Sequence, residues 1–104
     1  MQVNVRTDNH IAGRERLASY ITSVVEDSLS HFRQRITRVE VHLSDANGHK
    51  PGADDKRCVM EARLEGQRPI AVSHSSGSVD EAISGTASKL RRLVNDTLRR
   101  KRDN

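Results

Sequence analysis

The order in which two hydrophobic periodicities follow each other constrains the fold of this chain more than any other feature. In four short segments apolar residues recur at every second position, namely Val3 to Val5, Val39 to Leu43, Cys58 to Leu64, and Ile70 to Val72. This spacing is typical of strands with one buried face. Two longer segments, about 13–32 and from residue 78 onward, repeat apolar residues at helical spacing. The predicted element order is therefore β-α-β-β-β-α.

The connections between these segments limit how the strands can pair. A helix between the first two strands permits a right-handed parallel crossover, whereas the short Gly66-Gln67 turn makes the last two strands antiparallel. The polar stretch from Asp45 to Asp55 is predicted to be a loop too long for a tight hairpin. We expect one domain over residues 1–104 with an α+β fold of two layers. It consists of a four-stranded mixed sheet with two helices packed on one face and the other face in solvent.

The second predicted helix has a clear start and a continuous apolar stripe. Ser78 with Glu81 three residues later forms a capping-box pattern. At about 100° per residue the apolar stripe contains Val79, Ile83, Thr86, Leu90, Leu93, Val94, Thr97 and Leu98. Gly85 is predicted to weaken this helix by about 1 kcal/mol relative to Ala.

The positive charge of the chain is concentrated at the end of this helix. Residues 1–88 contain 11 Lys and Arg against 12 Asp and Glu, whereas residues 89–104 contain 7 against 2. The basic residues are Lys89, Arg91, Arg92, Arg99, Arg100, Lys101 and Arg102. On a helical wheel they lie on the flanks and back of the stripe, apart from Lys101. A rod with this charge can lie along phosphates, with a salt-dependent affinity. Complementing the helix dipole, the alternative role, needs only one or two cations.

A second, smaller basic patch is predicted where the first helix leads into the second strand. It contains Arg33, Arg35 and Arg38, and a solvated loop is an equally good interpretation of it. The predicted open sheet face presents Arg38, Glu40, His42, Arg57, Glu61 and Arg63 and lacks the aromatic residues on which unpaired bases stack. Recognition through helices is therefore favoured over recognition through the sheet.

Other kinds of function find little support in the sequence. The histidines His10, His31, His42, His49 and His74 show no zinc-motif spacing with one another or with Cys58, which we expect to be a small core residue. Motifs of hydrolases, phosphate loops and dinucleotide sites are missing from the sequence. No apolar run approaches the ~18 residues of a membrane span. We expect a cytoplasmic protein without metal, cofactor, small-molecule substrate, membrane contact or enzymatic activity.

The chain resembles the ribosome hibernation-promoting factor and ribosome-associated inhibitor family, formerly called sigma-54 modulation proteins. The likeness rests on the element order and on Met1-Gln2-Val3-Asn4-Val5, Arg38-Val39-Glu40-Val41-His42-Leu43, Asp80-Glu81-Ala82-Ile83 and Lys89-Leu90-Arg91-Arg92-Leu93. It implies a translation inhibitor that docks on the small ribosomal subunit and blocks the decoding region under stress. Lys89, Arg92, Arg99, Arg100 and their basic neighbours would contact ribosomal RNA, supported by the patch from Arg33 to Arg38.

The chain departs from the family pattern at three points. Ser84 stands where members usually carry Asp, the 45–55 stretch is longer and more acidic, and the extra C-terminal domain of long members is missing. We therefore expect no ribosome pairing by this chain itself. Two alternatives stay open, a general double-stranded nucleic-acid-binding domain and a basic protein-interaction module without ribosome specificity.

Overall fold

The computed structural model describes residues 1–8, 11, 13–46 and 55–103, with side chains up to residue 100. The elements are β1 (Gln2–Thr7), α1 (Arg14–Ser28), the short 3-10 helix η1 (Ser30–Phe32), β2 (Ile36–Asp45), β3 (Lys56–Leu64), β4 (Ile70–Ser76) and α2 (Val79–Asp103). This order matches the predicted β-α-β-β-β-α order.

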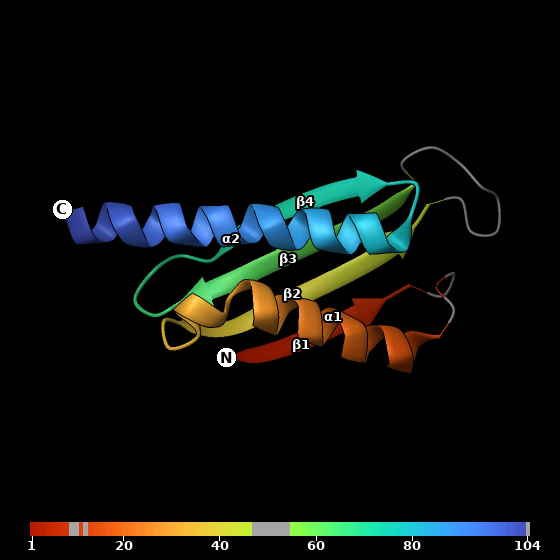
Figure 1. The fold of residues 1–104 in the computed structure, drawn as a ribbon, viewed down its shortest axis with the longest axis horizontal. Coiled ribbons are helices and arrows are strands. Elements are labelled where there is room, and N and C mark those ends of the chain that lie inside the picture. The colour runs from red at the N-terminus through yellow and green to blue at the C-terminus, as the bar shows by residue number, and fades with distance from the viewer. Residues whose placement is uncertain (9–10, 12, 47–54, 104) are drawn as a thin grey trace.

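The four strands form one sheet in the order β1-β2-β3-β4. β1 runs parallel to β2, while β2 with β3 and β3 with β4 are antiparallel. Both helices lie on the same face of the sheet, α1 over β1 and α2 along β3 and β4 (Figure 1). The predicted α+β fold with a mixed sheet and two helices on one face is confirmed.

The core lies between the helices and the covered sheet face and is aliphatic. Alternate residues of β2 and β3 point into it and are buried, namely Val39, Val41 and Leu43, and Cys58, Met60, Ala62 and Leu64. Each helix contributes a buried stripe, with Ile21, Val25 and Leu29 from the first segment and Ile83, Leu90 and Val94 from α2. Burial of this apolar surface is the main force that holds the two layers together.

The first helical segment is divided in two, where the periodicity predicted one helix up to Phe32. α1 ends at Ser28, and Leu29 leaves helical geometry with φ −108° and ψ 17°. The Leu29 N–H still donates to the Val25 carbonyl at 3.0 Å, and the Phe32 N–H donates to the Leu29 carbonyl at 2.9 Å, which closes η1. A tighter last turn keeps Leu29 buried while it redirects the chain toward β2.

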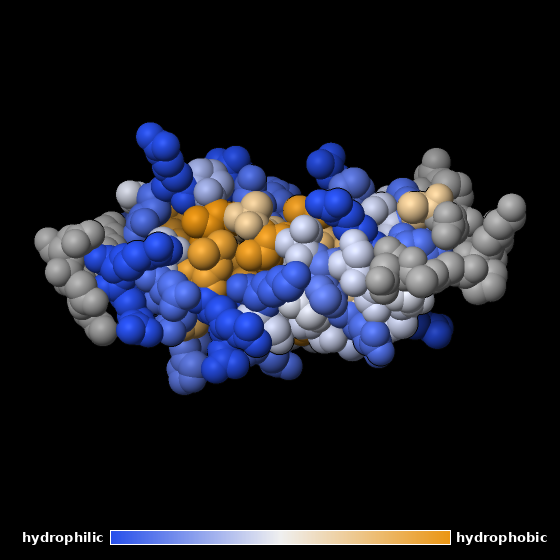
Figure 2. Space-filling model, turned by 90° about the horizontal axis from the view of Figure 1, so that it is seen from above, coloured by the Kyte–Doolittle hydropathy of each residue, from blue (hydrophilic) through white to orange (hydrophobic). Residues whose placement is uncertain are grey.

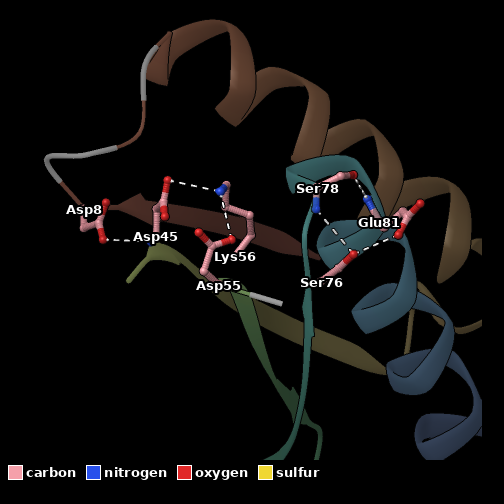
Figure 3. A network of polar contacts seen from close by, with 7 residues as sticks. All are labelled: Asp8, Asp45, Asp55, Lys56, Ser76, Ser78 and Glu81. Carbon is pink, nitrogen blue, oxygen red and sulfur yellow. Dashed lines mark hydrogen bonds and ion pairs between the residues drawn. The ribbon is translucent and has the colours of Figure 1, made fainter. Parts of the chain in front are cut away.

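β2 extends one residue into the predicted loop from Asp45 to Asp55, whereas β3 begins at Lys56, directly after it. Asp45 is the last residue of β2 and pairs with Lys56 at the start of β3, and residues 47–54 lie outside the described part of the chain. Lys56 Nζ lies 2.9 Å from Asp55 Oδ1 and 3.5 Å from Asp45 Oδ2, and the Asp45 N–H donates to Asp8 Oδ2 at 3.0 Å (Figure 3). The hydrogen bond to Asp55 is the main reason why the pKa of Lys56 is raised. These contacts accommodate two buried aspartates, Asp45 at the end of β2 and Asp55 directly before β3.

Candidate nucleic-acid interface

Side-chain hydrogen bonds fix the start of α2. Ser78 Oγ accepts the Glu81 N–H at 3.0 Å, as the capping-box pattern predicts. The Glu81 carboxylate does not return to the Ser78 N–H, however, but accepts a hydrogen bond from the Ser76 hydroxyl at 2.8 Å (Figure 3). Ser76 Oγ in turn lies 3.4 Å from the Ser78 N–H. The end of β4 and the first turn of α2 are thereby joined, which sets the direction of the helix.

The first turns of α2 pack very closely on the sheet. A Cβ atom added at Gly85 would lie 2.8 Å from Nε2 and 2.9 Å from Cγ of His74 on β4, distances that ordinary side chains do not reach. Gly85 is therefore more than the local weak point that helix propensity indicates, because it makes room for the His74 ring. The fully buried Thr86 hydroxyl lies 2.6 Å from the Ala82 carbonyl and 3.2 Å from the Cys58 carbonyl, so its proton is satisfied inside the core.

The apolar stripe of α2 predicted from the sequence faces the sheet along the described helix. Ile83, Thr86, Leu90 and Val94 are buried, whereas the stripe residues at its margins are half-buried. In Figure 2 an apolar area remains visible from above the view of Figure 1, surrounded by hydrophilic residues. The half-buried apolar residues of α2 and β4 are Val79, Leu93, Leu98, Ile70 and Val72. The helix thus closes the core with one face and turns its other faces to solvent.

Four arginines of α2 form an exposed cationic surface. Arg91, Arg92, Arg99 and Arg100 are all exposed, and none of them makes an ion pair with any described side chain. We call these four residues the arginine cluster. The last turns of α2 extend beyond the sheet and beyond α1, so this end of the helix is accessible from several sides (Figure 1). Uncompensated guanidinium groups on a projecting rod suit a partner with several phosphates.

Two other predicted site residues of α2 stand apart from this cluster. Lys89 is exposed, but its Nζ donates to the Ser73 carbonyl on β4 at 3.0 Å, so it anchors the helix to the edge strand. Arg102 lies within α2, and its side chain is outside the described residues.

The structure separates the three arginines of the smaller predicted patch. Arg33 lies at the helical face, where its Nη2 is 3.9 Å from Glu26 Oε2, and Arg35 is exposed. Arg38 belongs to β2 and points to the open sheet face, where its Nε lies 3.0 Å from Glu40 Oε1. Because side chains alternate along a strand, Arg38 is on the opposite side of the sheet from α2. The three arginines are therefore not one surface.

A groove joins the arginine cluster to the end of the first helical segment. Its walls are His31 and Phe32 of η1 and Arg91, Arg92 and Asn95 of α2, and its volume is about 410 Å³. His31 and Phe32 are not among the residues that the sequence predicts for the site. The available signal was the position of the only phenylalanine in the chain, one residue before the Arg33 patch.

The described residues offer little that supports another chemistry. Among them no three His, Cys, Asp or Glu side chains are grouped as metal ligands would be, and the predicted candidates His10 and His49 lie outside this part of the chain. Cys58 is completely buried, and this burial raises the pKa of its thiol to about 11, which keeps it protonated near neutral pH. None of the described helices is long and apolar enough to cross a membrane.

Fold and site together define a small two-layer α+β domain whose last helix carries a cationic surface. Residues 3–102 match the family model described as sigma 54 modulation protein / S30EA ribosomal protein, and the chain belongs to this family. The resemblance seen in the sequence is thereby confirmed.

Solved structures agree in fold. A ribosomal subunit interface protein from Coxiella burnetii superposes with a TM-score of 0.69 at 12% identity, covering 93% of this chain and 97% of that one. The N-terminal domain of Thermus thermophilus Protein Y gives 0.61 at 17% identity, covering 92% and 94%. Among curated proteins, no sequence matches this chain significantly.

Proposed function

We propose that this chain is an RNA-binding translation inhibitor that docks on the small ribosomal subunit and blocks its decoding region under stress. The observation that carries the proposal is the arginine cluster, which is exposed, lacks ion pairs with described residues and projects from the body of the fold. Membership of a family whose description includes a ribosomal protein supports the ribosome as the target. So does the name of the Coxiella burnetii neighbour, a ribosomal subunit interface protein.

The arginine cluster is the centre of the proposed site. Arg91, Arg92, Arg99 and Arg100 would contact the phosphates of small-subunit ribosomal RNA, and Arg102 would extend the row. Lys89, Arg33 and Arg35 lie on or next to the helical layer and would contribute at its margins. Arg38 would contribute least, because it faces the open side of the sheet and is paired with Glu40.

The proposed mechanism is occlusion and has no chemical step. A domain with extents of 48 × 24 × 20 Å can fill a groove of the subunit and exclude messenger and transfer RNA by its volume. Phosphate contacts give affinity without base specificity, and the shape of the site selects the location. The protein would act in the cytoplasm as a single domain, without cofactor or substrate.

Binding to purified small subunits at several salt concentrations tests this proposal. Replacing the four cluster residues with Gln is expected to weaken binding on the order of a hundredfold at low salt. The slope of log affinity against log salt should fall by roughly 0.7 to 0.9 units for each phosphate that the variant no longer binds. The matched control replaces Arg6, Arg14, Arg16 and Arg68 with Gln, four exposed arginines with no ion pair to a described residue, so the change in net charge is the same.

The outcomes separate the alternatives. Loss of binding in the cluster variant alone, together with loss of inhibition in a translation assay, supports the proposal. Equal weakening by both variants would mean that binding depends on the net charge of the domain and not on the position of the arginines. Equal affinity for small subunits and for an unrelated RNA duplex would favour the general nucleic-acid-binding domain, and a wild-type chain that binds neither would exclude RNA as the partner.

A further inference from the structure

We propose that the groove between η1 and α2 binds one unpaired nucleotide of the RNA target. The base would stack on the Phe32 ring and meet His31 at its edge, and its phosphate would be held by Arg91 and Arg92. This inference rests on the proposed RNA-binding function and assigns a specific ligand, a single-stranded nucleotide, to one part of the surface.

The placement of Phe32 is the first observation. The chain has one phenylalanine and one tyrosine, and its fully buried core is aliphatic. Phe32 packs against that core but is only half-buried, and it lines the groove. Its neighbour His31 is exposed, with the two ring centroids 6.4 Å apart and the ring planes at 69°. The Phe32 ring offers the flat apolar surface that a base requires, and the inclined His31 ring can contact the edge of that base.

The backbone that carries these rings is ordered before any ligand binds. The Phe32 N–H donates to the Leu29 carbonyl at 2.9 Å, and the Phe32 carbonyl accepts the Arg35 N–H at 2.8 Å. Leu29 is buried in the core before η1, and after η1 the Arg35 carbonyl accepts the Glu65 N–H at 3.1 Å, so the segment is held on both sides. A ring that is already ordered loses little freedom when a base stacks on it.

The opposite wall supplies the polar groups that a nucleotide needs. Arg91 and Arg92 are exposed and make no ion pair with any described side chain, so their guanidinium groups are available for a phosphate. Asn95, on the next turn of α2, has an amide that can both donate to and accept from a base edge. The volume of about 410 Å³ lies within the range of roughly 300 to 1,000 Å³ that is usual for small-ligand sites.

An unpaired nucleotide fits this arrangement better than a duplex. Bases inside an RNA helix are stacked on one another and cannot reach a ring inside a groove, whereas bases in loops, bulges and ends can. On the open sheet face, by contrast, the central strands β2 and β3 carry no Phe, Tyr or Trp, and their one ring is that of His42. The groove therefore brings an aromatic ring together with two arginines that make no ion pair with a described side chain.

A fluorescent variant tests the stack directly. Because the chain contains no tryptophan, Phe32→Trp places a single indole reporter in the groove and keeps a stacking surface. Titration with a single-stranded oligoadenylate of about ten nucleotides should quench its emission, and a blunt RNA duplex should not. An unchanged emission with the single strand, or equal quenching by the duplex, would overturn the proposal.

Affinity measurements give the second, independent readout. Phe32→Leu keeps an apolar side chain but removes the ring, and it should weaken binding to purified small subunits and to the oligonucleotide about tenfold, the effect of losing one base–aromatic stack. The salt slope should stay unchanged, because the arginines still bind the same phosphates. Tyr20→Leu is the control, because it removes an aromatic ring at an exposed position of α1 outside the groove. It should leave the affinity for small subunits and for the oligonucleotide unchanged.

A variant at an exposed position separates loss of binding from loss of folding. His31→Ala removes an exposed ring and should weaken single-strand binding severalfold with an unchanged unfolding transition. If Phe32→Leu and His31→Ala both bind like the wild type, the groove does not take a base. If the wild-type chain binds the oligonucleotide through the groove but not small subunits, the proposed ribosomal function fails while the nucleotide site stands.

Discussion

The two halves of α2 differ in what their side chains contact. The first half, residues 79–90, is connected to the sheet by four contacts. Ser76 and Ser78 cap its start, and the His74 ring packs over Gly85. The buried Thr86 hydroxyl contacts the Cys58 carbonyl, and Lys89 donates to β4. In the second half, residues 91–103, no side chain described up to residue 100 makes a hydrogen bond or an ion pair. The same helix therefore satisfies its polar groups internally at one end and leaves them for a partner at the other.

This division explains how a small basic domain can be both stable and ready to bind. Cations that were paired within the domain would have to break those pairs before they could bind a phosphate, and part of the binding energy would be lost. The first half instead holds the helix in place, so the second half can project its arginines without local support. Stability and binding should thus respond to different substitutions.

The largest expected difference between the halves is in core packing. Leu90→Ala empties a completely buried position and should lower the free energy of unfolding by about 2 to 5 kcal/mol. Leu98→Ala, at a half-buried position of the second half, should cost about 1 kcal/mol. Urea unfolding of both variants measures the contrast, and equal losses would mean that the second half is as well anchored as the first.

The next effect is a pH dependence of the free energy of unfolding, which depends on how completely the first half of α2 covers Cys58. Burial raises the pKa of Cys58 to about 11 from its ordinary value of 9.0, so the folded state favours the protonated thiol. The unfolded chain loses this proton first, and the resulting stability is complete below pH 9.0 and lost as the pH rises through about 11. The loss amounts to roughly 3 kcal/mol for two pKa units.

The measurement compares the wild type with Cys58→Ala across this pH range. The variant should show a flatter decline in unfolding free energy, while Lys56, whose pKa is also raised, contributes equally to both proteins. In the wild type at neutral pH, a thiol reagent should modify Cys58 only as fast as the protein opens. Rapid modification of the folded protein would show that the first half of α2 does not shield Cys58 from solvent.

The sequence predicted the parts of this molecule that depend on local patterns. Alternation and helical periodicity identify the strands, the stripe of α2 and the Ser78 cap, because those features repeat within a few residues. The placement of Cys58 in the core follows from the same alternation. Alternation also places Arg38 on the open sheet face, as observed, whereas its nearness in sequence to Arg33 and Arg35 wrongly suggested that the three arginines form one patch.

Contacts between distant segments could not be predicted. The groove needs η1 and α2 to meet, which brings Phe32 and Arg92 to the same groove although they lie 60 positions apart in the sequence. Likewise, the bond from Lys89 to Ser73 depends on where the helix crosses the edge strand. Periodicity specifies which face of a helix is buried, but not which residue of another element lies opposite each position.

Gly85 gives the smallest and most specific test of the division within α2. Helix propensity alone predicts that Gly85→Ala stabilises the protein by about 1 kcal/mol. The added Cβ would instead collide with the His74 ring, and overpacking of this kind costs about 1 to 3 kcal/mol, so we expect a net loss of about 1 kcal/mol. In a His74→Ala background the collision is gone and the same substitution should stabilise by about 1 kcal/mol. A double-mutant cycle on unfolding free energies measures this reversal of sign, and additive effects would show that the helix does not rest on His74. RNA affinity should be the same in all four proteins, because the arginines in the second half of the helix are not touched.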